Sequence, residues 1–138
     1  MPKTTRRGDP KQSELPSTIR KSDEHAQRIF AEVHDSALEE YQSEQRAHRV
    51  AYAALKHSYE KVGDHWEPKK QKGPSDERAR HGGPEPAGKT ARGVDANASK
   101  QHLLDVAKRL DISGRSRMTK KELIESIQRS NERARRKN

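Results

Sequence analysis

Apolar side chains recur every three to four residues in two consecutive stretches of the first half of the chain. The first stretch predicts an amphipathic helix over about residues 23–42, capped at its start by Ser22. The second stretch is rich in alanine, ends before Gly63 and predicts a helix over about residues 44–61. The two helices are expected to form a hairpin, because small alanine side chains let helices pack closely. The side chains available to close its open side are Leu15, Ile19, Tyr59, Val62 and Trp66.

A shorter helical pattern returns near the C-terminus. Ser99 can cap one helix, a loop around Gly114 follows, and Thr119 can begin a second helix. Thr119 and Glu122 fit the capping box, in which each side chain satisfies a backbone N–H of the other residue. From Arg129 onward the sequence has no apolar face, so we expect the end of the chain to fray.

These patterns predict an all-α protein with two helical modules. Order is expected over residues 14–67 and 99–130, whereas residues 1–13 are expected to form a disordered arm and residues 131–138 a basic disordered tail. Residues 68–98 are rich in proline, glycine and charge, which is typical of a flexible linker between independent modules. The residues expected in the cores are Ile29, Phe30, Val33, Val50, Tyr59, Trp66, Leu103, Leu110, Leu123 and Ile127.

The composition supports partial disorder and a polyanionic partner. Only 28% of residues are hydrophobic and 37% are charged, which leaves too little apolar surface to offset the entropy of ordering every residue. The net charge is +9, and residues 99–138 carry 12 Lys and Arg against 5 Asp and Glu. Residues 14–66 carry 7 against 10. Basic charge concentrated on one short structured segment favours binding to a polyanion.

Several kinds of site are absent from the sequence. The chain has no cysteine, which excludes disulfides and thiolate metal sites. No apolar run reaches the roughly 18 residues needed to span a bilayer. No apolar region follows the basic N-terminus, so we expect a cytoplasmic protein, with association with the nucleoid as one option. There is no phosphate-cradling glycine loop and no nucleophile elbow, and we therefore expect no enzymatic activity and no cofactor.

The histidines do not predict a metal site. The five histidines within residues 14–66 are His25, His34, His48, His57 and His65. No two of them are three or four residues apart, the helical spacing that brings two imidazoles to one ion. We therefore expect no bound metal.

Residues 14–66 contain the strings ELP, HAQRIFAEVHDSALEEY and AHRVAYAALKHSYEKVGDHW, in that order. On these strings the segment resembles the ChaB family over essentially a full domain, with Val50-Ala51, Lys56-His57, Tyr59 and Trp66 in the expected order. The family takes its name from an association with a bacterial cation antiporter. The resemblance implies a small helical domain and a role in the regulation of cation transport.

Residues 102–128 read HLLDVAKRLDISGRSRMTKKELIESIQ. The AKRLDI helix end, the Ser-Gly-Arg-Ser loop and the Lys-Lys-Glu-Leu-Ile helix start resemble the small helical domain at the N-terminus of the transcription terminator Rho. That domain is similar to SAP-type modules. The resemblance implies that this segment assists the binding of nucleic acid through a basic face.

Basic residues lie in or beside the loop between the two C-terminal helices. The candidate nucleic-acid-binding residues are Lys108, Arg109, Arg115, Arg117, Lys120 and Lys121. A helix start and nearby Arg and Lys side chains together form a phosphate site. The alternative is a solvated face that keeps a small module soluble. Residues 99–138 contain no Phe, Trp or Tyr, so we expect phosphate-dominated binding with low sequence selectivity.

The leading interpretation is a non-enzymatic nucleic-acid-associated protein. Its C-terminal module would bind DNA or RNA phosphates, and its ChaB-like region would serve a protein-interaction or structural role. The alternative is a regulator of cation transport that acts through protein contacts of the ChaB-like region, with the basic module binding an acidic protein. A third interpretation is a phage- or plasmid-type accessory protein without activity of its own. We expect no membrane insertion.

Overall fold

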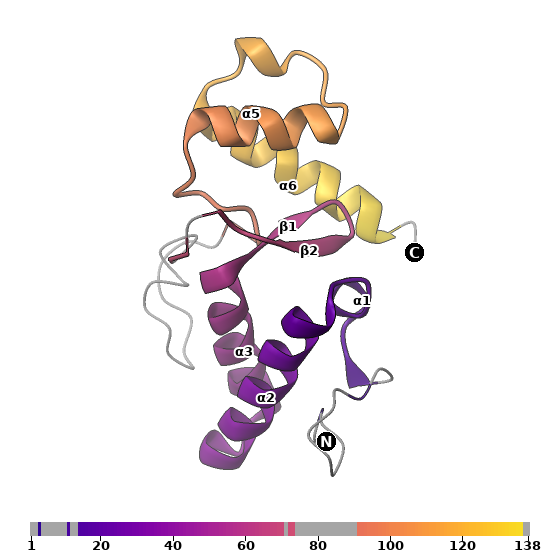
Figure 1. Ribbon diagram of the computed structural model, residues 1–138, viewed down its shortest axis with the longest axis vertical. Helices are drawn as coiled ribbons and strands as arrows, with labels where there is room; N and C mark the ends of the chain where they lie inside the picture. Colours follow the sequence, from indigo (N-terminus) through magenta and orange to yellow (C-terminus); the bar gives the residue numbers. More distant parts are fainter. Residues whose placement is uncertain (1–2, 4–10, 12–13, 71, 74–90, 137–138) are drawn as a thin grey trace.

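The computed structural model describes residues 3, 11, 14–70, 72–73 and 91–136. Most of these residues are helical, and a two-stranded hairpin lies between the two helical regions (Figure 1). Among the described residues, no helix is both long and apolar enough to cross a bilayer. The elements are α1 (Ser17–Arg20), α2 (Glu24–Tyr41), α3 (Glu44–Ser58), β1 (Tyr59–Val62), β2 (His65–Pro68), α5 (Lys100–Arg109), η2 (Arg115–Arg117) and α6 (Lys120–Arg136).

Helices α2 and α3 pack against each other as the helical hairpin that the two apolar stripes predict. The N-cap of α2 is Asp23, whose Oδ1 accepts a hydrogen bond from the Ala26 N–H at 2.8 Å. The prediction of Ser22 as the cap is therefore wrong. The Ser22 hydroxyl donates instead to the Thr18 carbonyl and accepts from the Trp66 N–H, both at 2.8 Å. Ser22 thus joins α1 to β2.

The antiparallel hairpin β1–β2 shows that the protein is not purely all-α. Helix α3 ends at Ser58, earlier than predicted, and Val62 pairs with His65 across a tight turn. Gly63 in this turn has a φ of 69°, a conformation that glycine adopts without a steric cost. Tyr59, Val62 and Trp66 in the strands are aromatic or β-branched and prefer extended backbone, and Gly63-Asp64 between the strands is a typical hairpin turn.

The first core lies between α1, α2, α3 and the hairpin. Its buried members are Leu15, Ile19, Ala26, Phe30, Ala31, Ala51, Leu55, Tyr59 and Trp66. Four of these, Leu15, Ile19, Tyr59 and Trp66, close the open side of the helical hairpin as predicted. Ile29 and Val33 pack partly buried against this core. Val50 is half-buried and lies outside the cluster, because its neighbour Ala51 occupies the buried position.

The second core joins the C-terminal helices to the hairpin. Its buried members are Val62, Ala91, Val94, Leu103, Val106, Ala107, Leu123 and Ile127, and Leu110 packs partly buried against them. Val62 comes from β1, while Ala91 and Val94 come from the segment predicted to be a flexible linker. Two short helices bury little apolar surface alone, and these three side chains enlarge their core. The expectation of two independent modules is therefore wrong.

The C-terminal segment is also more ordered than predicted. Helix α6 continues to Arg136, so the chain does not fray from Arg129. The physical reason is that Asn131 is only 2% exposed and contacts the β1–β2 turn. Residues 71, 74–90 and 137–138, and most of residues 1–13, lie outside the described residues. The predictions of an N-terminal arm and of a flexible central linker fall largely there.

Candidate nucleic-acid interface

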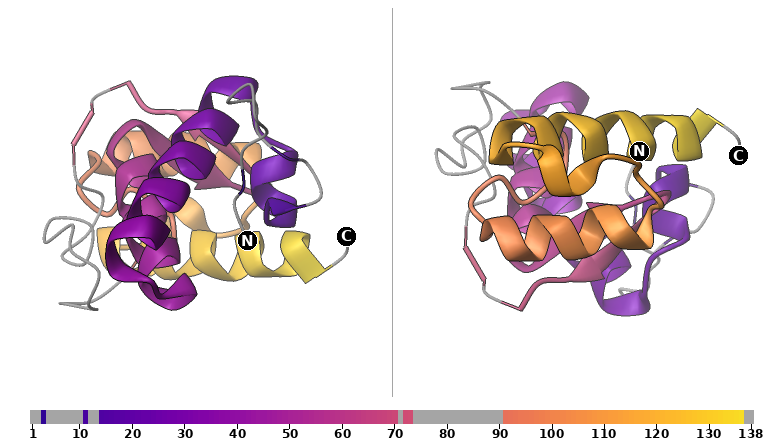
Figure 2. Two further views of the ribbon diagram at one scale, coloured as in Figure 1. Left: turned by 90° about the horizontal axis from the view of Figure 1, so that it is seen from below. Right: turned by 90° about the horizontal axis from the view of Figure 1, so that it is seen from above.

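Helices α5 and α6 lie side by side and run in the same general direction (Figures 1 and 2). The connection between them therefore returns from the end of α5 to the side where α5 begins. Gly114 adopts a φ of 74° at the start of η2, a left-handed conformation that favours glycine. The Ser99 hydroxyl caps α5 by accepting from the His102 N–H at 3.1 Å, which confirms the predicted cap.

The start of α6 is fixed by the predicted capping box. The Thr119 hydroxyl accepts from the Glu122 N–H at 3.2 Å, and the Glu122 carboxylate accepts from the Thr119 N–H at 3.0 Å. These hydrogen bonds lower the pKa of Glu122. Lys120 and Lys121 lie between the two capping residues and are both exposed. The first turn of α6 thus presents two cations on a fixed backbone.

The six predicted basic residues differ in what they contact. Four of them are exposed and form no ion pair with another described residue: Lys108, Arg117, Lys120 and Lys121. Arg115 is half-buried and donates from Nη1 to the Ile112 carbonyl at 3.1 Å. Arg109 donates from Nη2 to Glu67 Oε2 at 2.6 Å. Arg109 is therefore already paired with a carboxylate of β2.

The six residues also fall into two groups in space. Because the connection reverses, Lys108 and Arg109 lie at the far end of α5 from the start of α6. The ten residues of α5 span about 15 Å. The connection and the first turn of α6 carry the other four residues, Arg115, Arg117, Lys120 and Lys121. We call these four the connection cluster.

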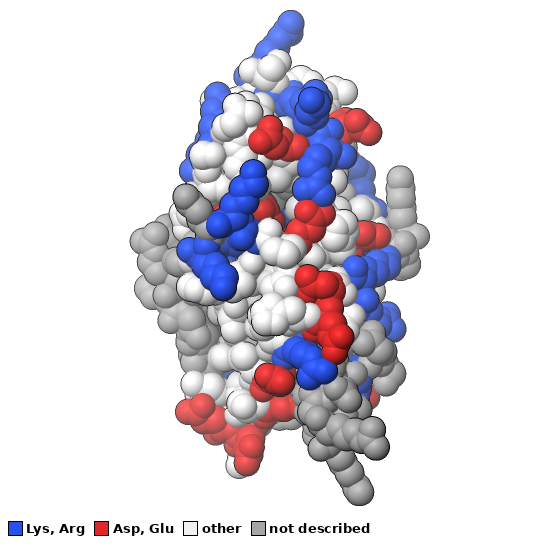
Figure 3. All heavy atoms as spheres, in the orientation of Figure 1, with Lys and Arg blue, Asp and Glu red and all other residues white. Residues whose placement is uncertain are grey.

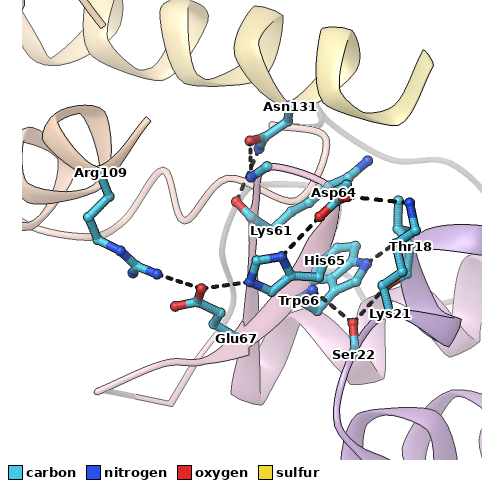
Figure 4. Close-up of polar contacts among 11 residues, drawn as sticks. Thr18, Lys21, Ser22, Lys61, Asp64, His65, Trp66, Glu67, Arg109 and Asn131 are labelled. Atoms are coloured by element: carbon cyan, nitrogen blue, oxygen red, sulfur yellow. Dashed lines mark hydrogen bonds and ion pairs between the residues drawn. The ribbon is translucent and has the colours of Figure 1, made fainter. Parts of the chain in front are cut away.

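Arg109 belongs to a chain of polar contacts that links α5 to the end of α1 across the hairpin (Figure 4). Glu67 Oε2 also lies 2.7 Å from His65 Nε2, and His65 Nδ1 lies 3.2 Å from Asp64 Oδ1. Asp64 Oδ2 accepts from Lys21 Nζ at 3.3 Å. The hydrogen bond from Arg109 lowers the pKa of Glu67, and the hydrogen bond from His65 lowers the pKa of Asp64. This network connects the two helical regions through side chains of the hairpin.

Asn131 of α6 forms a second polar contact with the hairpin. Its Oδ1 accepts from the Gly63 N–H at 2.6 Å, and its Nδ2 donates to the Lys61 carbonyl at 3.1 Å (Figure 4). The Lys61 N–H donates to the Gly93 carbonyl at 2.8 Å. A third contact joins His102 Nε2 to Glu60 Oε2 at 2.8 Å. The β1 strand is thus bound on several sides by later parts of the chain.

Charge is unevenly distributed over the surface. In the view of Figure 3, Lys and Arg gather over the upper part, which contains α5, η2 and α6. Asp and Glu gather at the lower end, where α2 and α3 are joined, and at the level of the hairpin. The connection cluster belongs to η2 and to the start of α6, which lie in this part of the molecule. This distribution agrees with the segmental charges of the sequence.

Sequence patterns did not indicate the residues that join the two regions. Glu67 and Asn131 lie outside every predicted site, although both are polar residues in mostly buried surroundings. Asn131 stands in the polar run after Arg129, where nothing local marks it as buried. For Glu67 we find no local signal, because its partner lies 42 positions away.

Two family models match the chain. The ChaB model matches residues 15–69, and the model of the Rho termination factor, N-terminal domain, matches residues 99–134. No curated protein and no solved structure matches it. The second match includes all of α5 and η2 and most of α6, so the connection cluster lies inside it. The chain therefore carries a ChaB domain followed by a Rho termination factor N-terminal domain.

Proposed function

We propose that this chain is a non-enzymatic nucleic-acid-associated protein whose connection cluster binds the phosphates of DNA or RNA. The observation that carries the proposal is the exposure of Arg117, Lys120 and Lys121 beside a capped helix start. Exposed Arg and Lys side chains bind phosphate oxygens through charge-assisted hydrogen bonds. The Rho N-terminal domain supports the proposal, because it suggests an association with nucleic acid.

The binding mode follows from the side chains of the interface. The Rho N-terminal domain contains no Phe, Trp or Tyr that would stack on a base. Affinity should therefore come mainly from contacts with phosphates, which do not depend on base sequence. We expect low sequence selectivity and a steep loss of affinity as salt concentration rises.

In this proposal the ChaB domain has a structural role in binding. Val62 enters the core of the Rho N-terminal domain, and Glu67 pairs with Arg109. Both contacts hold α5 against the hairpin and keep the connection cluster clear of the acidic end of the ChaB domain. The domain thereby orients the basic surface toward a polyanion.

The test is fluorescence anisotropy of the full chain with labelled double-stranded DNA, single-stranded DNA and RNA across a salt series. The triple variant Arg117→Gln, Lys120→Gln, Lys121→Gln removes three cations of the connection cluster. Its plot of log affinity against log salt should become shallower by roughly 2–3 in slope, because the slope is proportional to the number of phosphates that the protein neutralises. The full chain is needed because the two domains share a core.

A matched control removes three cations from the ChaB domain. The variant Arg20→Gln, Arg28→Gln, Arg46→Gln has the same net charge as the connection-cluster variant. It should retain most of the affinity of the unmodified chain. Equal loss of affinity in both triple variants would show that net charge, not the connection cluster, governs binding. Absence of salt-dependent binding by the unmodified chain would overturn the proposal and favour a regulator of cation transport that acts through protein contacts.

A further inference from the structure

Two histidines and a glutamate of the ChaB domain meet near the junction of α2 and α3. His34 Nε2 lies 2.7 Å from Glu44 Oε1, and His48 Nε2 lies 3.1 Å from the same oxygen. One ligand atom from each of the three residues lies within 4.8 Å of the other two. Ligand atoms bound to one tetrahedral Zn²⁺ at about 2.0–2.1 Å are separated by about 3.4 Å. Small side-chain movements would therefore place all three around a single ion.

The ring of His34 is held in one orientation. Its side chain is fully buried, and its Nδ1 lies 3.0 Å from Asp35 Oδ1. A carboxylate on the second ring nitrogen is the usual partner of a metal-binding histidine, because it fixes the tautomer that leaves Nε2 for the ion. Phe30 stacks on the same ring, with centroids 6.4 Å apart and planes inclined by 16°. The Nε2 atom is thus oriented before any ion binds.

The three donors have the chemistry of a transition-metal site. We propose that His34, Glu44 and His48 bind one divalent ion of the Zn²⁺ class, with water in the remaining position. Imidazole nitrogen with carboxylate oxygen suits Zn²⁺ and its neighbours in the first transition row. Side-chain exposures of 50% for Glu44 and 36% for His48 give the ion and its water an entry path.

One cation lies beside this site and opposes metal binding. Lys3 Nζ is 3.7 Å from Glu44 Oε1 and also donates to the Glu14 carbonyl at 2.7 Å. A bound divalent ion would repel this ammonium group and compete with it for the carboxylate. Lys3→Met should therefore raise the affinity for the metal, whereas loss of a ligand should lower it.

The test is isothermal titration of the untagged full chain with ZnCl₂, together with the visible absorption of bound Co²⁺. We expect one ion per chain and the intense Co²⁺ absorption of a tetrahedral site. Glu44→Gln and His48→Gln should each weaken Zn²⁺ binding by more than about tenfold, since loss of an outer-shell partner alone costs 10–100-fold. Both side chains are partly exposed, so these variants should fold. Asp35→Asn should weaken binding by about tenfold.

The matched control is His57→Gln, which changes an exposed histidine of the same helix. It should bind Zn²⁺ like the unmodified chain. Imidazole ¹⁵N chemical shifts would locate the ion, because only the Nε2 atoms of His34 and His48 should shift strongly. Failure of the chain to bind Zn²⁺ would overturn the proposal. Binding that is unchanged in both Glu44→Gln and His48→Gln would also overturn it, by placing the ion elsewhere.

Discussion

The side-chain amide of Asn131 is hydrogen-bonded to the backbone of two residues of the β1–β2 hairpin, Lys61 and Gly63. Its oxygen accepts from the Gly63 N–H at 2.6 Å, and its nitrogen donates to the Lys61 carbonyl at 3.1 Å. One residue of the Rho N-terminal domain therefore satisfies two backbone groups of the ChaB domain. Because Asn131 is 2% exposed, water cannot readily replace either hydrogen bond.

Replacing Asn131 with alanine should destabilise the folded protein. The substitution leaves a backbone donor and a backbone acceptor without their partner, which typically costs about 1–3 kcal/mol for a buried group. The effect should be visible in urea unfolding followed by the fluorescence of Trp66, the only tryptophan of the chain. Trp66 lies in the ChaB domain, so a lower midpoint would show that the two domains unfold together.

The control for this substitution is Glu125→Ala, which changes an exposed residue of the same helix. It should change the free energy of unfolding by less than about 0.5 kcal/mol, as is usual for surface positions. If Asn131→Ala left the Trp66 transition unchanged, the two domains would unfold separately. The description of β1 as a shared element would then be wrong.

Gly93 should tolerate no side chain. It has a φ of 97°, and a Cβ there would lie 2.8 Å from both the Lys61 Cβ and the Trp66 Cη2. Gly93→Ala should therefore lower the free energy of unfolding more than Gly114→Ala does. Gly114 has a φ of 74°, but nothing lies within 4 Å of a Cβ built there. We expect both variants to lose about 1 kcal/mol of stability from the backbone conformation alone. Gly93→Ala should lose roughly 1–3 kcal/mol more from the overlap of its Cβ with Lys61 and Trp66. Urea midpoints of the two variants give the comparison, and equal losses of stability would contradict it.

The helices could be predicted from the sequence because their signals are local. The apolar stripes of α2 and α3, the Ser99 cap and the Thr119–Glu122 capping box each involve residues a few positions apart. The β1–β2 hairpin also had a local signal in Gly63-Asp64 between aromatic and β-branched residues. Extending the second predicted helix to about residue 61 obscured this signal, because helix and strand patterns overlap over short runs.

The junction of the two domains could not be predicted in the same way. The contacts of Asn131 join residues 68 and 70 positions apart. No periodicity in one segment specifies which distant segment will cover it. The apolar pair Ala91 and Val94 stood in a segment of linker composition, and their burial depends on the surface that α5, α6 and Val62 leave open.

The candidate sites were predictable to different degrees. Position in the sequence located the basic residues around the connection, but not the pairing of Arg109 with Glu67. The expectation of no metal site rested on pairs of histidines alone. Glu44 and His48 are four residues apart on α3, so counting carboxylates as ligands would have indicated two of the three proposed ligands. His34 comes from the other helix and needed the hairpin geometry.

Lys108 and Arg109 are adjacent in sequence and should differ in their effect on nucleic-acid binding. Arg109 is held by Glu67 at 2.6 Å, so its charge is largely compensated, whereas Lys108 forms no ion pair with a described residue. Lys108→Gln should lower affinity for DNA up to about threefold at low salt, and Arg109→Gln less. In urea unfolding, Arg109→Gln should lower the free energy of unfolding more than Lys108→Gln, because it breaks a contact between the domains. Identical effects on both measurements would contradict this assignment.

Acid should weaken the junction through Glu67. The hydrogen bond from Arg109 is the largest cause that lowers the pKa of Glu67 below its ordinary value of 4.5. A carboxyl group whose pKa is lower in the folded than in the unfolded protein stabilises the fold above the unfolded pKa. That contribution is lost as pH falls through the folded pKa. The unmodified chain should therefore be more stable than Glu67→Gln at pH 7, and the difference should shrink steadily below about pH 4.5. Urea midpoints from pH 7 to pH 3 measure it, and Glu125→Gln controls for the change in net charge. A difference that persists undiminished at pH 3 would show that Glu67 stabilises the junction by packing and not through its charge.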